Sequence, residues 1–244
     1  MAVVTISRPR TRNALTTDVM TDLADAFDRA GGDDEVRALV LTGGATVFAS
    51  GADVRELRDT SPADYLASQR QAAWQRLAAF PKPTVTAVAG FVLGGGCELA
   101  LSCDLVVAAD TATFGQPEVR LGLLPGAGGS QRWARAAGRY RAAEVVLGTD
   151  TLDAWTAADY GVVAEVVPAE RVVEAGVALA ARVAAHSPVA VRLARQAVRS
   201  SEELPVTAAL AQEKSLLATL LSTEDHVEGI NAFLEKRPAN FVGR

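Results

Sequence analysis

The first half of the chain alternates short apolar runs with stretches whose apolar residues recur at helical spacing. Residues 16–30 place apolar side chains on one helical face and end at two glycines. Ser61 and Pro62 supply the N-cap and first-turn proline of a second helix, predicted to run to about Phe80. Apolar, largely β-branched runs predict strands at 2–7, 36–44, 84–90 and 104–110. This order predicts an α/β core with several crossovers.

Beyond about residue 168, helical signals follow one another with little strand signal between them. Pro188 and Pro205 separate the middle helices, and no Ser/Gly linker divides the chain. We therefore predict an α/β core with the active site at 1–186 and a helical C-terminal subdomain at 187–244. Its apolar faces must pack on the core or on another subunit, so we expect it to serve oligomerisation and pocket closure. The predicted helices cover 169–186, 188–199, 205–221 and 224–236.

The composition fits a globular protein with a sizeable core and argues against nucleic acid as the main partner. Hydrophobic residues make up 49% of the 244 positions and charged residues 22%, and the net charge is −5. Binding to a phosphate backbone needs a basic surface instead. Two local groups of arginines are interpreted either as solvated faces or as patches for the phosphates of a small ligand. They are Arg8, Arg10 and Arg12, and Arg132, Arg135, Arg139 and Arg141.

Cysteine and histidine usage predicts no metal site. Cys97 and Cys103 form no metal-ligand pattern, and His186 and His226 lie far away in the sequence. Free thiols in a reducing compartment are the simple interpretation. The N-terminus lacks the features of a signal peptide, and the apolar runs are short or interrupted by charge. We therefore expect a cytoplasmic protein with no membrane partner.

Glu98 lies in a glycine-rich segment, GGGCELALSCD (94–104). One interpretation is structural, because an acidic residue in the first turn of a helix interacts favourably with the helix dipole. However, three consecutive glycines cost backbone entropy that a plain helix cap does not need. They allow close approach to a ligand and present free N–H groups at a helix start. The alternative is therefore a carboxylate that moves protons beside a backbone site for negative charge.

Glu118 lies in a second such segment, FGQPEVRLGLLPGAGGSQR (114–132), which we expect to form a loop followed by a helix. Alone it would be an ordinary surface carboxylate. Its neighbours are mostly apolar, and apolar surroundings raise the pKa of a carboxyl group toward neutral pH. Gln116 is a side chain able to orient it by hydrogen bonding. The pair Glu98 and Glu118 is therefore a candidate for combined acid and base chemistry.

A third segment, FASGADVREL (48–57), follows a predicted strand. Asp53 is interpreted either as a helix N-cap or as part of a loop that presents a second backbone N–H toward a ligand. Two such donors aimed at a single oxygen form an oxyanion hole. The sequence lacks the G-x-G-x-x-G, G-x-x-x-x-G-K-[ST] and G-x-S-x-G signatures of dinucleotide, nucleotide and serine-hydrolase sites at the required places.

These segments together resemble the enoyl-CoA hydratase/isomerase family, also called the crotonase family. The resemblance covers nearly the whole chain, from ISRPRTRNAL (6–15) through LTGG (41–44) and the three segments above to FLEKRPANF (233–241). It implies a spiral of repeated ββα units followed by a helical C-terminal region that forms homotrimers, commonly paired into hexamers. Many relatives carry a strand before the first one matched here, and Trp133 replaces a smaller aliphatic residue.

The resemblance also implies roles for individual residues. The backbone N–H groups of Ala52 and Gly95 are expected to bind the thioester oxygen. Glu98 and Glu118 match the two catalytic glutamates, of which one activates water and Glu118 exchanges the α-proton. Gly126 matches a backbone donor near that water. Asp53 and Arg55, together with Ala52, are expected near coenzyme A, which enters as part of the substrate, so no cofactor is expected.

Retention of both glutamates favours a hydratase, a hydro-lyase that adds water to 2-trans-enoyl-CoA. Relatives that only shift a double bond usually keep the carboxylate at the Glu118 position alone. An enoyl-CoA isomerase of the same family remains the alternative enzyme. A non-catalytic acyl-CoA-binding scaffold is the alternative from another class. The sequence does not define the acyl chain length or the pathway.

Overall fold

The computed structural model describes residues 1–148 and 150–244. By internal contacts the chain forms two compact units, Met1–Ala180 and Ala181–Arg244. This boundary falls a few residues before the one expected from the sequence. The first unit contains both sheets, and the second contains helices only.

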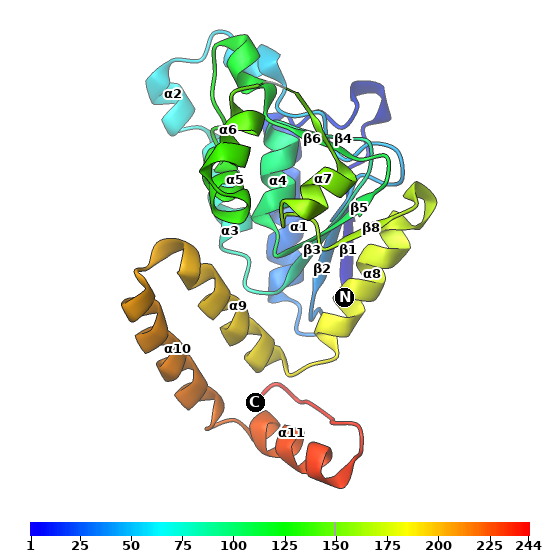
Figure 1. Cartoon of the computed structure of the whole chain (residues 1–244), viewed down its shortest axis with the longest axis vertical. Helices are drawn as coiled ribbons and strands as arrows, with labels where there is room; N and C mark the ends of the chain where they lie inside the picture. Colours follow the sequence, from blue (N-terminus) through cyan, green and yellow to red (C-terminus); the bar gives the residue numbers. More distant parts are fainter. Residues whose placement is uncertain (149) are drawn as a thin grey trace. The chain divides into compact units, whose positions relative to one another are not determined.

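A five-stranded parallel sheet forms the centre of the first unit (Figure 1). Its strands pair in the order β1-β2-β3-β5-β8, and each pairing is parallel. Parallel neighbours need crossover connections, which the helices between the strands supply. The strands are β1 (Ala2–Thr5), β2 (Leu39–Thr42), β3 (Thr84–Val88), β5 (Leu105–Ala109) and β8 (Glu165–Val167).

A smaller sheet runs beside the first and gives the fold its spiral repeat. It contains β4 (Phe91–Leu93), β6 (Thr113–Gly115) and β7 (Leu152–Asp153), with β4 and β6 parallel. Isolated bridges at Leu15–Ala52 and Ala49–Val92 continue this layer in the earlier repeats. Each repeat is therefore a strand of the large sheet, a short second strand or bridge, and a helix, as in β3-β4-α4. This is the spiral of ββα units expected from the sequence.

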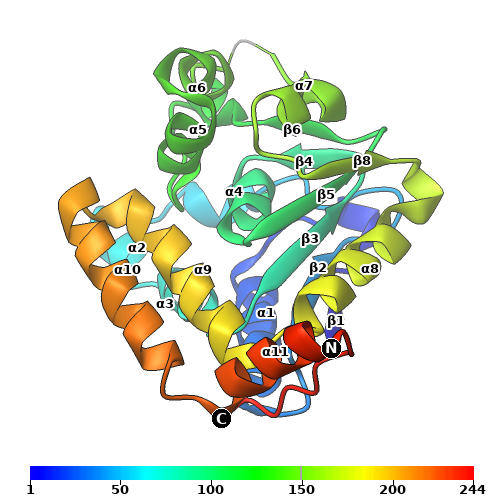
Figure 2. The ribbon, with the colours of Figure 1, turned by 60° about the horizontal axis from the view of Figure 1, so that its bottom comes forward.

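Helices cover both faces of the large sheet (Figure 2). Leu39 and Leu41 of β2 belong to the core cluster that also contains buried residues of α1. Val40, between them, contacts α8 at Gly176, because successive strand residues point to opposite faces. The helices of this unit are α1 (Thr17–Gly32), α2 (Pro62–Leu66), α3 (Gln69–Ala78), α4 (Gly95–Ser102), α5 (Gly129–Ala137), α6 (Arg139–Val146), α7 (Ala154–Asp159) and most of α8 (Val172–Ala184).

The single helix predicted from Ser61 to Phe80 is wrong, because two helices occupy that stretch. Ser61 caps α2 as expected, accepting a hydrogen bond from the N–H of Asp64. The chain then breaks, and Ser68 caps α3 by accepting from the N–H of Gln71. A serine inside a helical pattern offers the backbone a competing start, and here that second start is used. Glu118 also departs from the irregular loop expected, since Pro117–Leu121 forms the 3-10 helix η3.

The second unit consists of the end of α8 with α9 (Pro188–Glu203), α10 (Val206–Leu220) and α11 (Glu224–Glu235). The tail after α11 returns to that helix. Asp225 is buried and accepts hydrogen bonds from the N–H groups of Val242, at 2.7 Å, and Gly243, at 3.0 Å. The Arg237 guanidinium holds the pKa of Glu228 near 2. These contacts fix the C-terminal segment.

In the described part of the chain, no single helix is both long and apolar enough to cross a bilayer. Only the bent pair formed by 169–184 and 188–203 has the required length and composition together.

Candidate active site

Glu98 is a buried carboxylate in the first turn of α4, with only 4% of its surface exposed. Its Oε1 accepts hydrogen bonds from the backbone N–H groups of Ala127, at 2.6 Å, and Gly129, at 2.9 Å. Burial raises the pKa of Glu98, and these two donors oppose that rise by stabilising the charged form. Arg132 donates to the Ala127 carbonyl at 2.7 Å and so braces the same turn. The Glu98 side chain is therefore fixed in one orientation.

Glu118 lies in the first turn of η3 and reaches the glycine turn that precedes α4. A Cβ atom on Gly94 would lie 3.1 Å from Glu118 Oε1, so the carboxylate packs closely against that turn. Burial raises the pKa of Glu118 from 4.5 to about 7, and the nearby Glu98 charge adds to the rise. With its amide nitrogen toward the carboxylate, Gln116 donates to both Glu118 oxygens, at 3.0 and 3.1 Å. Glu118 can therefore carry or release a proton near neutral pH.

The backbone N–H groups of Ala52 and Gly95 form a pair of neighbouring donors. Leu15 pairs with Gly51 and Asp53 through its N–H and C=O, which leaves the N–H of Ala52 on the other side of the chain. Gly95 begins α4, where the first N–H groups have no partner within the helix. Neither N–H donates a backbone hydrogen bond within the described residues. A Cβ on Gly95 would lie 3.4 Å from the Ala52 nitrogen, so the two donors are close enough to share one acceptor.

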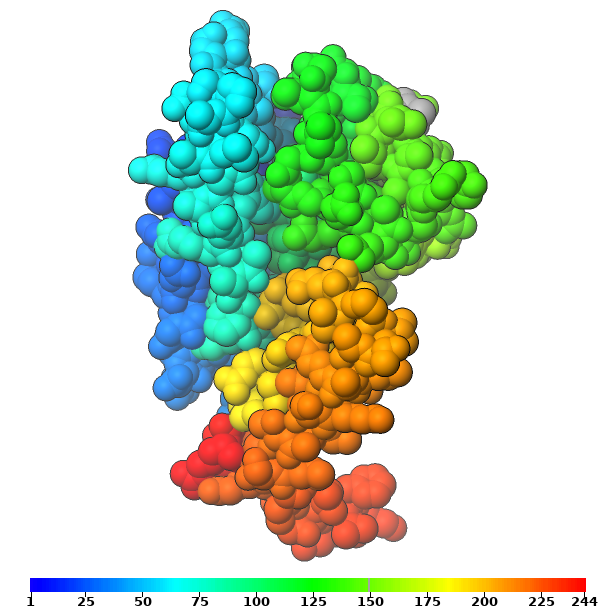
Figure 3. Space-filling model, turned by 90° about the vertical axis from the view of Figure 1, so that its left-hand side faces the viewer, coloured from blue at the N-terminus to red at the C-terminus, as the bar shows by residue number. Residues whose placement is uncertain are grey.

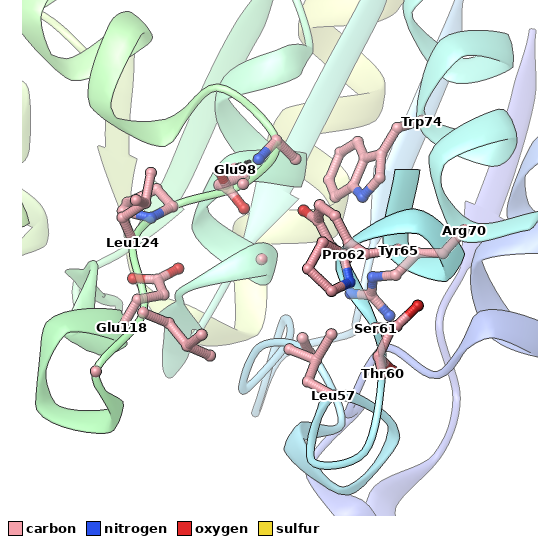
Figure 4. A pocket seen from close by; sticks show the side chains of 17 residues that line it. Leu57, Thr60, Ser61, Pro62, Tyr65, Arg70, Trp74, Glu98, Glu118 and Leu124 are labelled. Carbon is pink, nitrogen blue, oxygen red and sulfur yellow. Dashed lines mark hydrogen bonds between the residues drawn. The ribbon is translucent and has the colours of Figure 1, made fainter. Parts of the chain in front are cut away.

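One cavity of about 610 Å³ joins these groups (Figure 4). Glu98, Glu118, Ala52 and Gly95 all line it, as do Gly126 and the loop around it. The facing wall comes from η2 (Val54–Leu57), α2, α3 and the segment between them. In Figure 3 these two parts of the first unit, coloured cyan and green, stand on either side of a groove. The remaining lining residues are Leu57, Thr60, Ser61, Pro62, Tyr65, Arg70, Trp74, Gly122, Leu123, Leu124, Pro125 and Ala127.

Asp53 and Arg55 form an ion pair outside the cavity lining. Asp53 caps η2 through the N–H of Arg55, which agrees with its interpretation as an N-cap. The Arg55 guanidinium lies 2.5 Å from the Asp53 carboxylate and holds its pKa near 2. The Arg55 side chain is 75% exposed, so its charge remains open to solvent beside Ala52.

The sequence analysis named no residue of the wall formed by Tyr65, Arg70 and Trp74. A usable signal was present at Arg70, which shares the buried face of α3 with Ala73 and Leu77. A cation at the spacing of an apolar face is unusual, because arginine is rarely buried without a partner. Trp133, whose effect on the pocket the sequence left open, is fully buried in the core cluster and does not line the cavity.

Five of the seven arginines considered as phosphate patches, Arg8, Arg12, Arg132, Arg139 and Arg141, have local structural partners. Arg8 donates to the Ala14 carbonyl at 2.9 Å, and Arg12 stacks over the ring of Phe91. Arg139 and Arg141 stack over tyrosine rings in the same way. Among the described residues, no three His, Cys, Asp or Glu side chains are grouped as a metal ion would require.

A spiral of ββα units that carries two carboxylates beside paired backbone donors defines an acid/base site for substrates that develop negative charge on oxygen. The enoyl-CoA hydratase/isomerase family model matches residues 1–244. The chain therefore belongs to this family, also called the crotonase family, whose members act on acyl-CoA thioesters.

Individual relatives agree with this assignment. A 2,3-dehydroadipyl-CoA hydratase of Escherichia coli K12 is 44% identical over 242 residues, covering 99% of this chain and 95% of the relative. A probable enoyl-CoA hydratase of Mycobacterium bovis is 42% identical over 244 residues, covering 100% of this chain and 95% of the relative. The solved structure of an enoyl-CoA hydratase subunit from Geobacillus kaustophilus has a TM-score of 0.95 at 38% identity, covering 99% of this chain and 94% of that one. These relatives support a hydratase or lyase-type enzyme.

Proposed function

We propose that this protein is an enoyl-CoA hydratase that adds water to 2-trans-enoyl-CoA and forms 3-hydroxyacyl-CoA. The observation that carries the proposal is that Glu98 and Glu118 line the same cavity as the N–H groups of Ala52 and Gly95. Addition of water to a conjugated thioester builds negative charge on the thioester oxygen. The two backbone donors would each stabilise that charge by about 3–4 kcal/mol.

In the proposed reaction, Glu98 takes a proton from water as the water oxygen bonds to the β-carbon. Electrons of the double bond move toward the thioester oxygen, which the Ala52 and Gly95 N–H groups hold. Glu118 gives its proton to the α-carbon, and its pKa near 7 suits that exchange. Both carboxylates act from one side of the substrate, so addition is syn. The Gly126 N–H would help to hold the water, and Gln116 would orient Glu118.

No resident cofactor is required by this scheme, since coenzyme A arrives as part of the substrate. Asp53 and Arg55 would lie beside its nucleotide end, because the exposed Arg55 charge lies only three residues after the Ala52 donor. A relative named for 2,3-dehydroadipyl-CoA makes a carboxylate-bearing acyl group one candidate.

An enoyl-CoA isomerase is the second candidate, because Glu118 alone would suffice to move a proton between carbons. The two backbone donors that hold Glu98 favour hydration, since they fix a second carboxylate on the cavity. A non-catalytic acyl-CoA-binding protein would need neither carboxylate.

We also propose a homotrimer or a dimer of trimers. Support comes from large apolar side chains exposed on α10 and α11, including Leu217, Ile230, Phe233 and Leu234. Exposed apolar surface of this kind typically marks a protein interface. Light scattering coupled to size-exclusion chromatography gives the mass directly, and a monomer would contradict the proposal.

The activity test is loss of the conjugated enoyl absorbance of crotonyl-CoA, with 3-hydroxybutyryl-CoA identified by mass spectrometry. A 3-enoyl-CoA should in parallel show whether isomerisation occurs. Glu165→Gln, an exposed substitution away from the cavity, serves as the matched control. Isomerisation without hydration would favour the isomerase, and ligand binding without either reaction would favour the scaffold.

A further inference from the structure

Arg70 is a buried arginine whose guanidinium faces the cavity. Only 8% of its surface is exposed, and it lines the wall opposite Glu118 (Figure 4). The proposed hydration of a simple enoyl group uses no cation at this place. Arginine keeps its charge in proteins, so its charge must be compensated by neighbours or by a ligand.

The guanidinium is incompletely compensated by the described residues. Nη1 donates to the Leu15 carbonyl at 2.8 Å, and Glu56 lies 4.0 Å away from the same nitrogen. Its hydrogen bonds within the described residues thus use one of the five N–H groups that arginine offers, while the Glu56, Glu98 and Asp53 charges act on it without a hydrogen bond. Burial lowers the pKa of Arg70, which reflects the cost of holding a charge in these surroundings. An anionic ligand group would recover that cost.

The charge is within reach of a short acyl group whose thioester oxygen is bound by the backbone donors. A Cβ placed on Gly95 would lie 3.4 Å from the Ala52 nitrogen and 3.7 Å from Arg70 Nη2. The two nitrogens are therefore no farther apart than the sum of those distances. Each C–C bond is about 1.5 Å long. Four to six carbons are therefore long enough to join a thioester oxygen held at Ala52 to a carboxylate held at Arg70.

The other groups on this wall suit a chain that is apolar in the middle and charged at its end. Leu57, Pro62 and Trp74 are apolar, and Tyr65 adds a hydroxyl group. Glu98 and Glu118 would repel a ligand carboxylate. That repulsion is reduced because two N–H groups bind Glu98 and Glu118 holds a proton much of the time at neutral pH.

We propose that Arg70 binds a second carboxylate on the acyl group, so that the preferred substrates are enoyl-CoA esters of short dicarboxylic acids, of about four to six carbons. The inference rests on the proposed hydration and names the substrate class of the same site. Two other roles for Arg70 make different predictions. As a support for the Ala52 loop through Leu15, or as a contact for coenzyme A phosphates, it would affect every enoyl-CoA alike.

The test compares three substrates of equal carbon chain: 2,3-dehydroadipyl-CoA, its terminal methyl ester, and 2-trans-hexenoyl-CoA. We expect kcat/KM to be about 10- to 100-fold higher for the acid than for the ester, the range of a charged hydrogen bond. In Arg70→Leu this ratio should fall to near one, and Arg70→Lys should keep part of it. Because the ratio is taken within one variant, partial unfolding cancels from it. Arg76→Leu, an ion-paired surface position on the same helix, is the control.

A wild-type ratio near one, or a ratio that survives in Arg70→Leu, would overturn the substrate inference and leave hydration intact. Failure to hydrate any of the three would instead remove the proposed function. Titration calorimetry with adipyl-CoA and its methyl ester measures the same ratio as a difference in Kd without turnover. Equal Kd values for the two saturated esters would refute the carboxylate site independently of activity.

Discussion

Replacing Glu118 by glutamine should stabilise the folded protein at alkaline pH and leave its stability unchanged in acid. Burial raises the pKa of this carboxyl from 4.5 to about 7. Below about pH 4.5 the group is protonated in both the folded and unfolded states. Between the two pKa values only the unfolded chain releases the proton, so the free energy of unfolding falls as pH rises through about 7. Glutamine removes this loss.

The magnitude follows from the size of the shift. At about 1.4 kcal/mol for each pKa unit, the full shift corresponds to at most about 3 kcal/mol. Solvent access and the Gln116 amide both favour the carboxylate, so we expect about 1–2 kcal/mol. For a chain of this size that is roughly 2–8 °C in Tm.

The assay is thermal unfolding of wild type and Glu118→Gln across the pH range, with Glu165→Gln as the exposed control. The difference in Tm should be near zero at about pH 4.5 and reach its full size above about pH 8. An equal difference at both ends, or a variant less stable than wild type in alkali, would refute the reasoning. Either result would mean that the Glu118 carboxylate is not destabilised by its surroundings.

Three further predictions concern activity. Glu98→Gln should lower kcat for hydration by about 10²–10⁴-fold. It should retain CoA-ester binding, because the amide oxygen can still accept hydrogen bonds from both backbone donors. Turnover equal to wild type in a stopped absorbance assay would exclude Glu98 from proton transfer. The kcat/KM for hydration should decline above about pH 7 as Glu118 loses its proton, and a flat pH profile would contradict its role as the acid. Gly126→Ala should lower activity, because its Cβ would lie 2.4 Å from the Tyr65 hydroxyl. Adding Tyr65→Phe should restore much of the activity. A double variant as inactive as Gly126→Ala would place the defect elsewhere.

Local sequence signals predicted much of the wall of the candidate site that carries Glu98 and Glu118. The helix start at the glycine turn put Glu98 in a first turn, and an N-cap was one of the two interpretations of Asp53. Each of these features depends on residues within a few positions of one another. The pairing of Ala52 with Leu15 depends on a distant segment, so its free N–H followed only from the family resemblance.

The opposite wall could not be predicted in the same way. The spacing of apolar residues supported one helix from Ser61 to Phe80 and outweighed the local start signal of Ser68. The order of the five strands in the large sheet is likewise set by long-range packing. Arg70 was passed over because an arginine on a predicted helix is ordinarily at the surface.

The break between α2 and α3 has a consequence for how this enzyme can diversify. The carboxylates and their donors come mainly from 94–129, whereas the wall facing them comes from 57–74. Because Ser68 restarts the helix, Pro62–Leu66 is a short cassette with its own cap at Ser61. Substitutions within that cassette can change the shape of the cavity wall while Glu98 and Glu118 stay in place. The two walls of the cavity are thus encoded mainly in separate stretches of the chain, with the Ala52 donor as the exception.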